Sequence, residues 1–95
     1  MNPDTQPFLA ELTALILDAS EKPLPEGGLQ RDEVLFGTAS RLGLDSLDAL
    51  QISMAILKSY GIRMADSKDT RRAMASLDTL AAFLLDKGAV PKHSP

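Results

Sequence analysis

The chain is 95 residues long and carries a formal net charge of -3, with 44% hydrophobic, 24% charged and 4% aromatic residues. A chain of this length forms one small domain, and its acidic balance disfavours nucleic acid as a partner, because phosphate binding needs clustered Lys and Arg. Cysteine is absent from the sequence, which excludes disulfides, thiolate catalysis and cysteine-based zinc sites.

The first residues give no sign of export or membrane insertion. The sequence MNPDTQP has no basic segment, and the apolar run after it is interrupted by Glu11 and Asp18. We therefore expect no signal peptide, no membrane span and a cytoplasmic location. The single histidine, His93, lies near the end of the chain, so a Ser-His-Asp arrangement is disfavoured. The protein is predicted not to be an enzyme, with no catalytic residue and no metal site.

Residues 5 to 20 form the first predicted helix. Apolar residues recur there at helical spacing, and the sequence EKPLPEGG ends the run. The next segment, 21 to 45, holds two prolines and four glycines without a sustained period, which predicts a long loop between the first and second helices. Apolar anchors are expected to pin this loop, namely Val34, Leu35, Phe36, Leu42 and Leu44. Loops of this length in small domains are often functional.

Three further helical segments follow. The second helix is predicted over 46 to 60 and is ended by Gly61, a residue type that adopts the left-handed conformation common at helix ends. A short helix is expected around 67 to 72, and a last helix begins after the cap Ser76 and ends before Gly88. No stretch alternates with the period of a β-strand, so the expected fold is an all-α bundle of three main helices and one short helix. A monomer is expected for the free protein.

The second predicted helix has apolar residues on two sides. On a wheel of about 100° per residue, one cluster is expected to face the core: Ala49, Ile52, Ser53, Ile56 and Tyr60. A second stripe is expected beside it: Leu47, Leu50, Met54 and Leu57. The fully solvated side is then left with Asp48, Gln51, Ala55, Lys58 and Ser59. A chain this short has too little apolar material to bury both clusters, so the second stripe is predicted to dock onto a partner.

Ser46 begins this helix in the sequence GLDSLDALQ, and an ordinary capping role is one interpretation. Asp45 is a better cap, because it places Asp48 at the third helical position and puts both carboxylates at the positive end of the helix dipole. The Ser46 hydroxyl is then not needed for capping, and exposed N–H groups there favour an anion such as a phosphate ester. No base is evident to activate this serine, so it is predicted to be an attachment point rather than a nucleophile.

The sequence LGLDSLDALQISMAILKSYGI resembles that of acyl carrier proteins, whose signature is Asp-Ser-Leu at the start of the second helix. Most of residues 5 to 87 fits the layout of this family. The fit includes a glycine two residues before the acid, an aromatic residue followed by Gly-Ile at the end of the second helix, and a later helix that starts with Ser-Leu in SLDTLAAFLL. The resemblance implies a small four-helix acyl-carrier-protein-like bundle over residues 1 to 88, followed by a flexible tail at 89 to 95.

The same resemblance implies a covalent cofactor. In the family, a separate magnesium-dependent phosphopantetheinyl transferase moves 4'-phosphopantetheine from coenzyme A to the signature serine, which is Ser46 here. Acyl intermediates are then held as thioesters on that arm. Family positions that meet partner enzymes or flank the acyl chain are occupied by Asp45, Leu47, Asp48, Leu50, Met54 and Ile62, and the second stripe adds Leu57 to this predicted partner surface.

The sequence departs from carriers of housekeeping fatty acid synthesis. Those proteins usually continue the second helix with several glutamates, whereas the corresponding positions here are Gln51, Leu57, Lys58 and Ser59, with Arg63 after the helix. The segment LFGTASRLGLDSLDALQI is most similar to carriers of aryl polyene and related secondary polyketide clusters. This similarity implies a specialised type II pathway, with a ketosynthase, a ketoreductase, a dehydratase and acyl-loading enzymes as partners.

Two other interpretations stay open. Peptidyl carrier proteins usually show a histidine or aspartate after two glycines, whereas Gly-Leu-Asp precedes the serine here, in a chain that we expect to be free-standing, which favours the acyl carrier. The other interpretation belongs to a different functional class: a helical interaction domain that carries no modification and binds a partner helix through the second stripe. A helix-turn-helix DNA-binding domain is disfavoured, because Lys68, Arg71 and Arg72 are a small basic cluster on an acidic chain.

Overall fold

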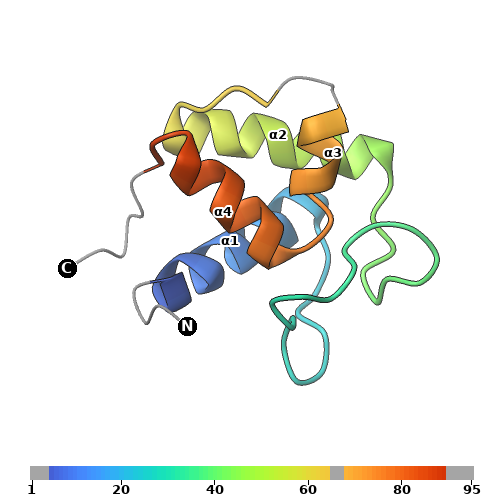
Figure 1. Cartoon of the computed structure of the whole chain (residues 1–95). Helices are drawn as coiled ribbons and strands as arrows, with labels where there is room; N and C mark the ends of the chain where they lie inside the picture. The colour runs from blue at the N-terminus through green and yellow to red at the C-terminus, as the bar shows by residue number, and fades with distance from the viewer. Residues whose placement is uncertain (1–4, 65–67, 90–95) are drawn as a thin grey trace.

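The computed structural model describes residues 5 to 64 and 68 to 89, so that the expected tail from 89 to 95 lies outside the described residues except for its first residue. Within the described residues the chain forms four helices, α1 (Thr5–Ser20), α2 (Ser46–Tyr60), α3 (Lys68–Ala73) and α4 (Leu77–Asp86), as Figure 1 shows. Apart from one isolated parallel bridge between Phe36 and Leu44, these residues hold no strand. The predicted all-α class is confirmed, with three longer helices and one short helix.

The first two helices end where the sequence predicts, each through a residue in the left-handed conformation. Glu21 follows α1 with a φ of 56°, and the next N–H, that of Lys22, donates to the Leu17 carbonyl at 3.0 Å. Gly61 follows α2 with a φ of 70°, and its N–H donates to the Leu57 carbonyl at 2.9 Å. These bonds satisfy carbonyl groups that a helix end otherwise leaves open.

The two C-terminal helices follow one another closely. α3 ends at Ala73, one residue later than expected, and the Met74 N–H still donates to the Thr70 carbonyl at 3.0 Å. The expected start of this helix at Ser67 lies outside the described residues. α4 begins directly after Ser76, as the sequence predicts. None of the described helices has the length and apolar character needed to cross a membrane.

The core lies where α1 meets α2 and α4, and α3 packs against α4 (Figure 1). Its largest fully buried side chains come from the three longer helices and the long loop: Phe8, Leu12, Ile16, Leu35, Leu44, Ile52, Ile56, Leu77, Leu80 and Leu84. Full burial of one such side chain is worth about 1.5 to 3 kcal/mol. The fold therefore depends mainly on apolar contacts between helices that are distant in the sequence.

A polar contact also joins the C-terminal end of α2 to α1. The Tyr60 hydroxyl donates a hydrogen bond to Oε1 of Glu11 at 2.5 Å, and the Tyr60 ring meets Phe8 edge to face with centroids 5.6 Å apart. Burial, together with the Glu11 carboxylate, raises the pKa of Tyr60 far above its ordinary value. This end of α2 is thereby fixed against α1.

The long loop between α1 and α2 is anchored by only part of the expected apolar cluster. Leu35, Leu42 and Leu44 are buried and Phe36 is half-buried, but Val34 is 51% exposed. The prediction of Val34 as an anchor is therefore wrong. Successive side chains of an extended segment point to opposite sides, so Val34 points away from the core that Leu35 enters.

Two arginines add polar anchors to this loop. Arg41 donates to both carboxylate oxygens of Glu33, at 2.6 and 3.0 Å, and to two backbone carbonyls of the loop, at 2.8 and 2.6 Å. Arg31 donates to Oδ1 of Asp78 on α4, at 2.6 and 2.8 Å. The two guanidinium groups lower the pKa values of the Glu33 and Asp78 carboxyls. The loop is therefore tied to itself and to α4 as well as to the apolar core.

Candidate functional site

The start of α2 is capped by two carboxylates. Oδ1 of Asp45 accepts a hydrogen bond from the Asp48 N–H at 3.0 Å, and Oδ2 of Asp48 accepts one from the Asp45 N–H at 3.1 Å. The bond from the Asp48 N–H is the main cause that lowers the pKa of Asp45 below 3.8, and the charge of Lys22 acts weakly in the same direction. The prediction that Asp45, rather than Ser46, caps this helix is confirmed.

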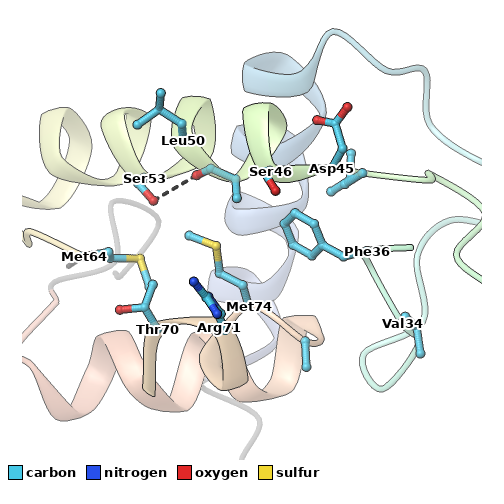
Figure 2. Close-up of a pocket in the computed structure, with 13 residues that line it drawn as sticks. Val34, Phe36, Asp45, Ser46, Leu50, Ser53, Met64, Thr70, Arg71 and Met74 are labelled. Carbon is cyan, nitrogen blue, oxygen red and sulfur yellow. Dashed lines mark hydrogen bonds between the residues drawn. The ribbon is translucent and has the colours of Figure 1, made fainter. Parts of the chain in front are cut away.

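Ser46 is the first residue of α2, and its side chain is exposed. Among the described residues its hydroxyl has no hydrogen-bond partner. Figure 2 shows this hydroxyl on the side of α2 that faces Phe36 and Met74. The hydroxyl is therefore available for chemistry, at a helix N-terminus whose N–H groups and dipole favour an anion.

An open groove of about 790 Å³ lies beside Ser46, between α2, the long loop and the segment around α3 (Figure 2). From α2 and its cap, the groove is lined by Asp45, Ser46, Ala49, Leu50 and Ser53. From the loop, it is lined by Val34, Phe36 and Leu44. From α3 and its flanks, it is lined by Met64, Thr70, Arg71, Met74 and Ala75.

Polar groups are few in this groove, and they are unevenly placed. Among the described residues, the two lining residues that carry a formal charge are Asp45, beside Ser46, and Arg71, on α3. The Ser53 hydroxyl donates to the Ala49 carbonyl at 2.9 Å and is thus turned back onto its own helix. Figure 2 shows the Arg71 guanidinium reaching into the space between α2 and α3. The described residues therefore line a mainly apolar channel, with one acid near the serine and one base further along.

The second stripe predicted on α2, called the outer stripe below, is exposed. The exposed fractions are 65% for Leu47, 55% for Leu50, 59% for Met54 and 48% for Leu57. At 100° per residue these positions lie about 140° to 220° from Ile52 on the helix wheel. The stripe thus lies beside the first cluster, as expected, because Leu57 is only about 40° from the half-buried Ser53, and it extends to the side of the helix opposite Ile52. The described part of the chain leaves it uncovered.

The inner side of α2 agrees with the prediction only in part. The positions expected to face the core are buried at Ile52 and Ile56 and half-buried at Ala49, Ser53 and Tyr60. Of the positions expected to be fully solvated, the exposed ones are Gln51 and Lys58, and the half-buried ones are Asp48, Ala55 and Ser59. These last three lie within about 60° of Ile52 on the helix wheel. They therefore belong to the edge of the core face.

The residues predicted to meet partners divide among four places. In the groove lie Asp45 and Leu50, and Leu50 also belongs to the outer stripe. On the outer stripe alone lie Leu47, Met54 and Leu57. Asp48 completes the cap, and Ile62 is half-buried against the core. The groove and the outer stripe are thus neighbouring surfaces of one helix that share Leu50.

Sequence reasoning missed most of the groove wall. The sequence marks Phe36 only as a loop anchor and Arg71 only as part of a small basic cluster, and it gives no reason to single out Met64 or Met74. One usable signal is the spacing of three between Arg71 on α3 and Met74 directly after it, which places both on one side of a helical turn. That spacing does not reveal that this face meets α2.

No family model matches this sequence, and no curated protein or solved structure matches it. In the described ranges, no group of three or more His, Asp and Glu side chains is arranged to hold a metal ion. The function of the site is therefore inferred from an available hydroxyl, an apolar groove and an exposed apolar stripe.

Proposed function

We propose that this protein is an acyl carrier protein, in which Ser46 carries 4'-phosphopantetheine and acyl intermediates are held as thioesters on that arm. The observation that carries the proposal is the Ser46 hydroxyl, which is exposed, lacks a partner among the described residues and lines an apolar groove. Because Asp45 and Asp48 complete the cap, modification of Ser46 removes no hydrogen bond that holds the helix.

The surroundings of Ser46 fit such a group. A phosphate ester there would lie in the first turn of α2, where unpaired N–H groups and the helix dipole favour an anion. The carboxylates of Asp45 and Asp48 oppose a further negative charge, but both are engaged by N–H groups of the cap, and salt screens exposed charges. The sequence contains no cysteine, so the thiol that a thioester requires has to come from an attached group.

Attachment to Ser46 requires an outside enzyme. The Ser46 Oγ forms a bond to the phosphorus of the pantetheine phosphate, a P–O bond of the coenzyme A diphosphate breaks, and the nucleotide part leaves. No described side chain is hydrogen-bonded to Ser46 Oγ in a way that could remove its proton. A phosphopantetheinyl transferase with its magnesium ion supplies that base, so the protein is a substrate in this step rather than an enzyme.

Intact-mass measurement tests the proposal directly. Incubation with coenzyme A, magnesium and a broad-specificity transferase is expected to add the mass of one phosphopantetheine to the wild-type protein and to Ser59→Ala, and nothing to Ser46→Ala. Ser59 is a matched control, because it is a serine of the same helix that does not line the groove. An unchanged wild-type mass, or a modified Ser46→Ala protein, would rule the proposal out.

The polarity of α2 favours a specialised pathway over housekeeping fatty acid synthesis. Its acids are limited to Asp45 and Asp48 at the first turn, and the exposed positions further along are apolar, Gln51 or Lys58. An enzyme whose basic patch binds a row of acidic side chains would therefore form few ion pairs with this helix. The proposed partners are the ketosynthase, ketoreductase, dehydratase and acyl-loading enzymes of a cytoplasmic type II aryl polyene or polyketide system. The acyl mass on protein purified from its own cells identifies the pathway.

A second candidate function is supported by the outer stripe. Four exposed apolar residues on one side of α2 would suit a partner helix, with no modification of the protein. This function predicts an unmodified native mass and full partner binding by Ser46→Ala. A peptidyl carrier protein would share the attachment at Ser46 and would differ in an aminoacyl cargo, which the mass of the native protein also identifies.

A further inference from the structure

We infer that residues 31 to 44, called the strap below, hold the start of α2 to the junction between α3 and α4, and that the ion pair of Arg31 with Asp78 is the releasable end of this strap. When that end is released, the loop-side wall of the groove beside Ser46 becomes free to move. The inference concerns motion of the folded chain, so it stands or falls independently of what Ser46 carries.

Helix α2 packs closely against one other helix only. Within the described ranges, Cα atoms of α2 come within 8 Å of those of α1 but not of those of α3 or α4. Its middle is held by the buried Ile52 and Ile56, and its C-terminal end by the bond from Tyr60 to Glu11. Ser46 begins the helix at the opposite end, where the long loop leads into it (Figure 1). The position of this end relative to α3 therefore depends on the loop.

The strap is tied first to the start of α4. The Asp78 N–H donates to the Arg31 carbonyl at 2.8 Å, and the Arg31 guanidinium donates to Oδ1 of Asp78 at 2.6 and 2.8 Å. Further along, the Leu35 N–H donates to the Ala75 carbonyl at 3.1 Å. Leu35 is buried, whereas the side chains of Arg31 and Asp78 are 35% and 40% exposed. Dissolved ions therefore reach the ion pair more readily than the Leu35 anchor.

The other end of the strap is tied to the start of α2. The Leu35 carbonyl accepts a hydrogen bond from the Leu44 N–H at 3.4 Å and one from the Ser40 hydroxyl at 2.7 Å. The Gly37 N–H donates to the Leu44 carbonyl at 3.1 Å. Leu44 directly precedes the residue that caps α2. The cap of α2 is thus connected to the start of α4 through the strap.

The strap carries the loop-side wall of the groove. Val34 and Phe36 line the groove and flank the Leu35 anchor, and Figure 2 shows Phe36 on the side that the Ser46 hydroxyl faces. Val34 is exposed and Phe36 is only half-buried, so their own burial holds them weakly. Their position depends on the backbone bonds on either side. Loosening of the Arg31 end therefore affects this wall more than it affects the core.

The ion pair at the Arg31 end is the weakest of these ties. Exposed ion pairs contribute little to stability, and salt screens them, whereas the burial of Leu35 does not depend on screening. The second ion pair of the loop, that of Arg41 with Glu33, joins two positions within the strap and none on a helix. It braces the strap internally, so that the strap is released at its Arg31 end rather than unravelled.

Amide hydrogen exchange of the protein unmodified at Ser46 tests the strap. At low salt, Asp78→Asn is expected to speed exchange of the Leu35, Gly37 and Leu44 amides about two to five times, as loss of an exposed ion pair allows. Asp69→Asn is the matched control, because Asp69 also lies in the first turn of a helix but has no ion pair among the described residues. It should leave the three strap amides at the wild-type rate.

Salt gives a second readout of the same tie. Between about 0.01 M and about 1 M salt, the screening length falls from about 30 Å to about 3 Å. Exchange of the strap amides should therefore speed up with salt in the wild-type protein and in Asp69→Asn, but hardly in Asp78→Asn. The NMR signals of the Phe36 ring should shift with salt in the first two proteins and stay in place in the third.

Two results would overturn the inference. If Asp78→Asn speeds exchange of the α1 amides around Ile16 as much as that of the strap amides, the ion pair stabilises the whole fold and the strap has no releasable end. If Asp78→Asn and Asp69→Asn behave alike, the bond to Arg31 does not hold the strap. Neither result bears on phosphopantetheine attachment, which intact mass reports separately.

Discussion

Helices α2 and α4 begin with the same capping arrangement in opposite settings. At α4 the reciprocal cap is built from Ser76 and Thr79, where Ser76 is buried and the Thr79 hydroxyl donates to the Ala73 carbonyl at 2.7 Å. At α2 the cap is built from Asp45 and Asp48, and both are reached by solvent. A serine that caps a helix is used by the fold, whereas a serine just inside an aspartate cap remains available for chemistry.

The two helices also differ in how they use their apolar residues. α4 buries one apolar face, formed by Leu77, Leu80, Ala81 and Leu84. α2 buries Ile52 and Ile56 and leaves the outer stripe exposed on the opposite side. The two helices have the same backbone geometry, so the difference lies in the number of apolar sides. α4 therefore packs most of its apolar residues into the core, whereas α2 packs one apolar side and leaves a second apolar side exposed.

The largest expected effect separates the two serines. Ser46→Ala should abolish phosphopantetheine attachment and change the free energy of unfolding by no more than about 0.5 kcal/mol, because its hydroxyl holds no bond in the fold. Ser76→Ala should retain attachment and lower the free energy of unfolding by about 1 to 2 kcal/mol, because it removes a buried cap. Intact mass and urea unfolding measure the two effects. Equal destabilisation by both substitutions would show that both serines serve the fold.

A matched pair of leucine truncations tests the two apolar faces. Leu84 is fully buried, so Leu84→Ala is expected to lower the free energy of unfolding by about 2 to 5 kcal/mol. Leu57 is 48% exposed, so Leu57→Ala is expected to stay within about 0.5 kcal/mol of the wild-type protein. Urea unfolding followed by circular dichroism gives both values. Comparable losses would place Leu57 in the core and remove it from the outer stripe.

The outer stripe should dominate binding to the cognate ketosynthase or another partner enzyme. Burying a leucine is worth about 1.5 to 3 kcal/mol, whereas an exposed ion pair is worth about 0 to 1 kcal/mol and fades with salt. We therefore expect Leu50→Ala or Leu57→Ala to weaken binding more than Asp48→Asn does, with a shallow dependence on salt. Titration calorimetry at low and high salt measures both. Silent leucine variants, together with an affinity that collapses in salt, would assign the interface to the acids.

The smallest expected effect is a dependence of stability on pH, which the aspartate cap of α2 should show because its carboxylate titrates, unlike the hydroxyl cap of α4. The folded-state pKa of Asp45 lies below 3.8, so its contribution to stability is present above that value and is lost as the pH falls through the folded-state pKa. Asp45→Asn keeps an oxygen that caps the helix but does not titrate. Between about pH 6 and about pH 3, the wild-type protein should therefore lose stability relative to Asp45→Asn in urea unfolding. Parallel pH profiles would show that ionised Asp45 adds nothing to the cap.

The helices and the available serine could be predicted because their determinants are local. The cap formed by Asp45 and Asp48, the end at Gly61 and the cap Ser76 each act within about one turn of the helix they delimit. The spacing of apolar residues fixed the length of α1 and α2 for the same reason. The availability of Ser46 followed from the neighbouring aspartate alone.

The groove and the loop contacts could not be predicted, because their parts meet only in the folded chain. Phe36 and Arg71 line one groove from segments 35 positions apart in the sequence. The bond between Arg31 and Asp78 spans 47 positions, and no sequence pattern pairs these two residues. The helix wheel gave the angle between residues of α2 but not the direction in which α1 lies. The outer stripe was therefore identified correctly beside the first cluster, whereas the half-buried state of Asp48, Ala55 and Ser59 was not predicted.

The hydrogen bond between Tyr60 and Glu11 holds the C-terminal end of α2, and Ser46 stands at the other end, 14 residues away, which corresponds to about 21 Å along the helix axis. Between the two ends, Ile52 and Ile56 pack in the core. Over such a length, a tilt of about 3° around the Tyr60 end would displace Ser46 by about 1 Å. Under the proposed function, the length of α2 would therefore convert a small rotation of the helix into a change of space beside the attachment point.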